Sequence, residues 1–69
     1  MPDAQKHELY QKIRDVEEIV ERLHQLEYYV LGIANRDANF GHIYQQILQI
    51  IQLTEYERIR LYQELNKML

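Results

Sequence analysis

The 69-residue sequence contains no cysteine, no serine and no tryptophan, and it has only one proline and two glycines. Without cysteine the fold has no disulfides, which fits a reducing compartment. Without serine or cysteine, no catalytic triad based on either nucleophile can form within one chain. The three histidines, His7, His24 and His42, share no metal-ligand spacing. We therefore expect a non-enzymatic protein with no metal and no cofactor.

Basic residues are also in short supply, with eight against eleven acidic residues and a formal net charge of −3. This balance disfavours nucleic acid as the main ligand, because a phosphate-binding surface needs clustered Lys and Arg. No apolar run reaches the roughly 20 residues that a membrane-spanning helix needs. Residues 1–10 lack the apolar core of a signal peptide. We expect a cytoplasmic protein with no membrane segment.

Charge is missing altogether from residues 38–54, although the rest of the chain is rich in it. The polar side chains of this stretch are mostly Gln, and its apolar ones are Phe40, Ile43, Tyr44, Ile47, Leu48, Ile50, Ile51 and Leu53. A helix of this kind is built to be covered on most sides. A single domain of this length forms only a small core and needs additional support. We predict that a second copy, in a homodimer, or a partner protein covers the stretch.

The first helix is predicted over about residues 3–31, where no residue interrupts the pattern. Apolar residues recur there at steps of four and three, typical of a coiled coil. They are Leu9, Ile13, Val16, Val20 and Leu23, and we expect them to form the seam of a hairpin or of a dimer. After Leu23 the next apolar residue is Leu26, and this step of three predicts a shift of the seam around the helix.

A turn is predicted over residues 32–40. Gly32 or Asn35 suits a left-handed residue after the first helix, and Asp37 or Asn39 suits the cap of the next. Thr54 and Glu57 fit a capping box, which predicts that the second arm is either kinked near Thr54 or split into two helices, about 41–53 and 55–69. One unbroken second helix is the alternative. Overall, we predict a single all-α domain, an antiparallel helical hairpin that dimerises into a helical bundle.

Tyrosine is the dominant aromatic residue, with six tyrosines against one phenylalanine. Tyr is favoured at interfaces because it buries a large ring while its hydroxyl stays hydrated. Adjacent residues of a helix point about 100° apart, so one hairpin partner cannot cover both Tyr28 and Tyr29. Our candidate protein-binding residues are Tyr28, Tyr29, Tyr44, Ile47 and Ile51. The predicted function is protein–protein interaction, as a regulatory or adaptor subunit.

A DNA-binding regulator is the alternative function, with a helix-turn-helix in residues 41–69 and Arg58 and Arg60 on its recognition helix. Residues 53–61, Leu-Thr-Glu-Tyr-Glu-Arg-Ile-Arg-Leu, resemble the Leu-Ser/Thr-x-x-Glu-Arg-x-x-Leu stretch of some small bacterial antitoxins. The resemblance implies an antitoxin-like protein. It covers a short part of the chain, and we assign no family from it.

Overall fold

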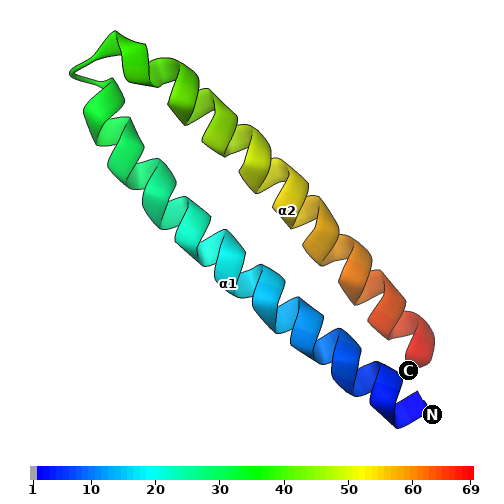
Figure 1. The fold of residues 1–69 in the computed structure, drawn as a ribbon. Coiled ribbons are helices and arrows are strands. Elements are labelled where there is room, and N and C mark those ends of the chain that lie inside the picture. The colour runs from blue at the N-terminus through cyan, green and yellow to red at the C-terminus, as the bar shows by residue number, and fades with distance from the viewer. Residues whose placement is uncertain (1) are drawn as a thin grey trace.

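The computed structural model describes residues 2–69, which form two long antiparallel α-helices joined by a short connection (Figure 1). Helix α1 spans Pro2–Ala34, the 3-10 helix η1 spans Ala38–Phe40, and α2 spans Gly41–Met68. The predicted all-α helical hairpin is therefore confirmed. The Cα radius of gyration is 15.9 Å, whereas a globular domain of this length would have about 11 Å. The molecule is a thin rod of 53 × 14 × 12 Å.

The connection reverses the chain without any left-handed residue. Helix α1 continues through Gly32, and it closes with bonds from the Asn35 amide to the Leu31 carbonyl (3.0 Å) and from the Asp37 amide to the Ile33 carbonyl (2.9 Å). Within residues 2–69 no φ is positive, so the predicted left-handed residue at Gly32 or Asn35 is wrong. The reversal is made by extended backbone at Asp37, with φ −139° and ψ 107°. The Asp37 carboxylate caps η1 by accepting a bond of 3.0 Å from the Asn39 amide.

Gly32→Ala is expected to stabilise the hairpin by about 0.5–1 kcal/mol. Gly32 lies in helical backbone, and a Cβ added there meets no atom within 4 Å. Urea unfolding followed by circular dichroism measures the difference between the variant and the natural chain. The opposite sign would indicate that Gly32 leaves the helix in solution, because Ala is strained at a left-handed position.

The second arm is one helix, so its predicted division into helices 41–53 and 55–69 is wrong. The Thr54 hydroxyl does not cap a helix start but donates a 2.7 Å bond to the Ile50 carbonyl, four residues earlier in the same helix. The Glu57 carboxylate pairs with Arg60 instead of reaching back to the Thr54 amide. Because α2 has no internal turn, the helix-turn-helix considered for residues 41–69 does not form either.

The core is a narrow strip along the line where the two helices meet. Its open-end cluster consists of Leu9, Ile13, Leu61 and Leu65, with Val16 packed against it. Its turn-end cluster consists of Val30, Ile47 and Ile51, with Leu23 and Tyr44 packed against it. All five predicted seam residues lie on this line, Val20 being the buried residue between the clusters. Among residues 3–69, no side chain is completely enclosed.

Polar residues separate the two clusters at the middle of the rod. Between Ile51 and Leu61, the positions of α2 that continue the three- and four-residue steps are Thr54 and Arg58, and both are partly buried. Arg58 pairs with Glu55 of its own helix at 2.8 Å. The apolar strip therefore has a waist, formed by Val20 with Thr54 and Arg58.

The seam of α1 continues in regular steps beyond Leu23, so its predicted shift to Leu26 is wrong. Val30 is buried while Leu26 is 47% exposed. The position between Leu23 and Val30 that faces α2 is taken by Glu27, which is partly buried. The partly buried Glu27 carboxylate is stabilised there by two polar partners, the Tyr44 hydroxyl at 3.3 Å and His24 Nδ1 at 3.2 Å. A charged residue in the seam hides the regular spacing from a search for apolar residues.

Candidate interaction surface

The described part of the chain contains neither a group of side chains suited to a metal ion nor a helix suited to a membrane span. Residues 2–69 hold no group of three or more His, Cys, Asp or Glu side chains arranged to bind a metal ion. Neither helix in this range contains a stretch long and apolar enough to cross a bilayer. The sites to consider are therefore the surfaces of the rod.

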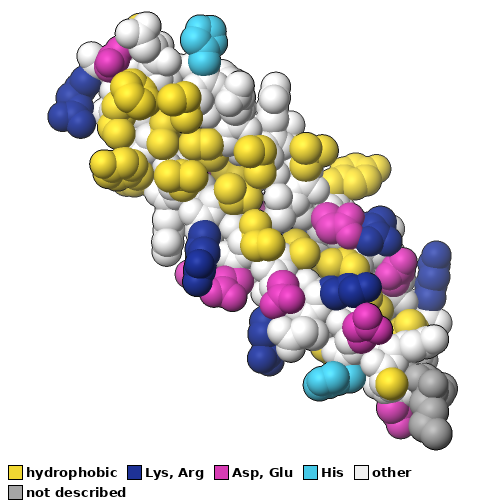
Figure 2. All heavy atoms as spheres, in the orientation of Figure 1, with side chains coloured by type: hydrophobic (Ala, Val, Ile, Leu, Met, Phe, Trp, Pro, Cys, Tyr) yellow, Lys and Arg dark blue, Asp and Glu magenta, His cyan; other side chains and the backbone are white. Residues whose placement is uncertain are grey.

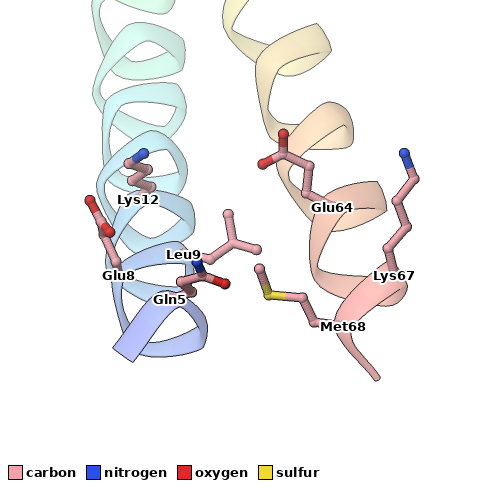
Figure 3. A pocket seen from close by; sticks show the side chains of 7 residues that line it. All are labelled: Gln5, Glu8, Leu9, Lys12, Glu64, Lys67 and Met68. Carbon is pink, nitrogen blue, oxygen red and sulfur yellow. The ribbon is translucent and has the colours of Figure 1, made fainter. Parts of the chain in front are cut away.

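A shallow groove lies between the helices at the open end of the hairpin (Figure 3). Leu9 of α1 and Met68 of α2 point towards each other across its floor. Its other lining residues are polar: Gln5, Glu8, Lys12, Glu64 and Lys67. The groove combines both signs of charge. It shows that Lys12 and Glu64 lie on the same side of the rod.

The five predicted protein-binding residues do not form one surface. Tyr28 and Tyr29 are 82% and 68% exposed on α1. Tyr44 packs against the turn-end cluster, while Ile47 and Ile51 are inside it. Ile47 and Ile51 are therefore covered by the chain's own α1, and no partner can reach them while the hairpin is intact. The prediction that these two residues face a partner is wrong for the folded hairpin.

One long edge of the rod, the polar edge, is closed by hydrogen bonds between the helices. Tyr62 donates to Glu17 at 3.0 Å, and Tyr44 donates to Glu27 at 3.3 Å. The bond to Glu17 and burial raise the pKa of Tyr62, and burial together with the Glu27 charge raises the pKa of Tyr44. His24 lies 4.0 Å from Glu55 on the same edge. The polar side chains named on this edge therefore have partners within the chain itself.

The opposite edge carries two columns of residues, one on each helix, spaced by seven. Residues seven apart lie on nearly the same side of a helix, since two turns take 7.2 residues. On α1 the column is Lys12, Ile19, Leu26 and Ile33, and on α2 it is Ile43, Ile50, Glu57 and Glu64. Lys12 and Glu64 share the open-end groove, and the charge of Lys12 contributes to the lowered pKa of Glu57, whose main cause is its bond to Arg60. The two columns therefore run side by side.

Each column changes character along the rod, being apolar towards the turn and charged towards the open end. The apolar face consists of Ile19, Leu26, Ile33, Ile43 and Ile50, together with Leu53 at its rim. Ile19, Leu26, Ile43 and Ile50 are 44–48% exposed, and Leu53 is 72% exposed. Figure 2 shows a broad hydrophobic area over the half of the rod nearest the turn, whereas most of the Lys, Arg, Asp and Glu side chains in this view lie on the other half.

The charged half of this edge is organised mainly by α2. Arg60 bridges Glu57 and Glu64, the latter at 3.0 Å. These contacts raise the pKa of the Arg60 guanidinium, the bond to Glu57 being the main cause. Among residues 3–69 Lys12 has no carboxylate within 4.0 Å. Arg58 and Arg60 pair within α2, and among residues 3–69 neither lies within 4.0 Å of a carboxylate of α1.

The sequence does not predict the apolar face directly, because Leu26 also fits a seam that shifts after Leu23. The signal was nevertheless present in the spacing. Ile19, Leu26 and Ile33 form an unbroken series of sevens beside the seam, as do Ile43 and Ile50 on the second helix. A second apolar series next to a complete seam indicates a second surface to be covered.

No known protein family, curated protein or solved structure matches this chain. Its function is therefore inferred from the surfaces of the hairpin itself.

Proposed function

We propose that this chain is a small, non-enzymatic protein–protein interaction module, a regulatory or adaptor subunit whose binding surface is the apolar face. The observation that carries the proposal is the run of half-exposed Ile and Leu side chains along one edge of the turn half. Contiguous apolar patches on a small protein mark sites of association. The face is depleted of charge, as the centres of interfaces are.

The thin core supports the same conclusion. Among residues 3–69 the hairpin buries eight apolar side chains and leaves thirteen large apolar or aromatic ones exposed. A core of this size supplies only about 3–5 kcal/mol, and small scaffolds without disulfides or metals gain stability by association. Covering the apolar face would remove further apolar area from water at about 25 cal/mol per Å². Binding and stability are therefore coupled in this proposal.

Site-specific photocrosslinking in cells that produce this chain tests the proposal. A photoreactive amino acid replaces Ile50 on the apolar face in one variant and Gln52 in a matched control. Residues two apart point about 200° from each other, so the control probes the opposite side of α2 at the same level. We expect strong crosslinks to protein from position 50 and few from position 52. Equal yields at the two positions, or no protein adduct from position 50, would contradict the proposed function.

A further inference from the structure

We propose that the occupant of the apolar face is a second copy of this chain, placed so that both turns lie at the same end of a four-helix bundle. This inference deepens the proposed function and depends on it. In the arrangement the two-fold axis runs along the rod between the copies. Each α1 then lies against the α2 of the other copy, and all neighbouring helices are antiparallel.

The two columns match each other at three of their four levels, and a self-match of this kind is what such an axis requires. In a symmetric interface a patch must complement itself, with residue i on residue j and j on i. The axis places the α1 column of one copy on the α2 column of the other at the same height. Ile33 then faces the level of Ile43, near the turn, and Leu26 faces that of Ile50. Ile19 faces the level of Glu57, so the apolar parts of the columns cover each other at the two levels nearest the turn in both copies.

The charged halves match in the same arrangement. Lys12 of one copy comes to the level of Glu64 of the other, and among residues 3–69 of its own hairpin Lys12 has no carboxylate within 4.0 Å. Because of the symmetry this match occurs twice. The reversed arrangement, with full overlap and the turns at opposite ends, would place Ile33 and Ile43 on Lys12 and Glu64. Apolar side chains would then cover charges that have lost their water, which is unfavourable.

The size of the face is also sufficient for a stable dimer. A rod with Cα extents of 53 Å by 14 Å presents a long side close to the roughly 800 Å² per partner that a standard interface buries. The apolar half alone covers only part of this area, so the charged half must belong to the interface. The match must therefore extend beyond the apolar half, and the parallel arrangement extends it to the level of Lys12 and Glu64.

Sedimentation equilibrium of the purified full chain tests the inference first. We expect a species of twice the 8.5 kDa chain mass. Leu26→Glu is expected to weaken association by roughly a hundredfold or more, since the symmetry buries two new carboxylates. The matched control Gln25→Glu adds the same charge at an exposed neighbouring position and is expected to leave the dimer intact. Leu53→Glu, at a 72% exposed side chain, is the second variant in case Leu26→Glu loses its helical circular dichroism.

Charge exchange tests which helices meet. Lys12→Glu and Glu64→Lys are each expected to weaken their own dimer by about tenfold, as two exposed pairs become repulsive. Mixing the two variants restores both pairs between the copies, so the mixture is expected to associate like the natural chain. Repulsion inside each hairpin stays the same in the mixture, and recovery therefore reports contact between copies. No recovery on mixing would overturn the proposed pairing of α1 with α2.

The relative direction of the copies is measured with a spin label on Asn39→Cys at the turn, which is the only thiol because the chain has no cysteine. Turns at the same end give a label separation on the order of 10–25 Å, set by neighbouring helix axes. A separation approaching the 53 Å length of the rod would overturn the parallel arrangement. A chain that stays monomeric at millimolar concentration, or a dimer indifferent to Leu26→Glu, would overturn self-association through this face. If position 50 then still crosslinks to a different protein, the proposed function stands and only the identity of the occupant fails.

Discussion

Ile47→Asp is expected to unfold the hairpin almost completely at 25 °C. Ile47 is 6% exposed at the centre of the turn-end cluster. The substitution loses about 1.5–3 kcal/mol of apolar burial and places a carboxylate among apolar neighbours, which costs several kcal/mol more. A core of this size supplies only about 3–5 kcal/mol in total. Circular dichroism at 222 nm should show loss of the helical signal and of a cooperative melt.

Gln46→Asp is the matched control, because it introduces the same charge one residue earlier on an exposed side of α2. We expect this control to melt within about 0.5 kcal/mol of the natural chain, as substitutions on the surface usually do. Equal and small effects at positions 46 and 47 would show that the turn-end cluster does not form in solution. The comparison thus separates burial at one position from the general cost of a charge in the charge-free stretch.

Glu55→Pro is expected to destabilise the hairpin by about 3 kcal/mol or more. In an unbroken α2 the proline removes the bond from its amide to the Ile51 carbonyl and its ring clashes with that carbonyl. A helix that started at Thr54 would instead tolerate proline at its first position, where the amide has no helical partner. The free energy of unfolding in urea therefore distinguishes one helix from two.

Glu55→Ala is the control for the lost ion pair with Arg58, and it should cost no more than about 1 kcal/mol. Thr54→Ala completes the series with a change of at most about 0.5 kcal/mol, because the Thr54 hydroxyl bonds its own helix and caps nothing. A cost of about 1 kcal/mol for Thr54→Ala, together with a harmless Glu55→Pro, would indicate a helix start at Thr54.

The helical hairpin could be predicted because its signals are local and repeated. Leu9, Ile13, Val16, Val20 and Leu23 follow the helical period, and nothing between residues 3 and 31 competes with it. Asp37 was predictable as a capping residue, since a short carboxylate beside a free amide is a strong local preference, but it caps η1 and not α2, whose N-cap residue Phe40 makes no side-chain cap bond. These features depend on residues close to one another in the chain.

Helix boundaries were less predictable because several of the residues used to place them have two roles. Gly32 can end a helix or lie within one at a modest cost, and here the continuing seam at Val30 keeps it helical. Thr54 can cap a helix or bond the carbonyl four residues earlier. The choice depends on the other helix, whose contacts with Ile51 and Leu61 keep α2 continuous through the middle of the rod. Local sequence does not contain that information.

The candidate surface was the hardest feature to predict, since it is defined by what the hairpin leaves uncovered. Ile47 and Ile50 are equally apolar in the sequence, yet the first is buried and the second is half exposed. Their difference arises from which side of α2 meets α1, and that is set by the register of the two helices. Once Glu27 is recognised as a member of the seam, the register follows, and Leu26 moves to the outer surface.

Because of the waist at Val20, Thr54 and Arg58, α1 and α2 can separate from each other in one half of the rod without separating in the other. The turn-end cluster is tethered by the connection, whereas within residues 2–69 no connection joins the two helices at the open-end cluster, which can therefore fray more easily. Fraying that starts at Leu9 and Leu65 meets few apolar contacts to break at the waist, so it can stop there and leave the turn half closed. In the half that bears the apolar face, the two helices are thus the last to separate from each other. This half stays packed while the helices open and close at the other end.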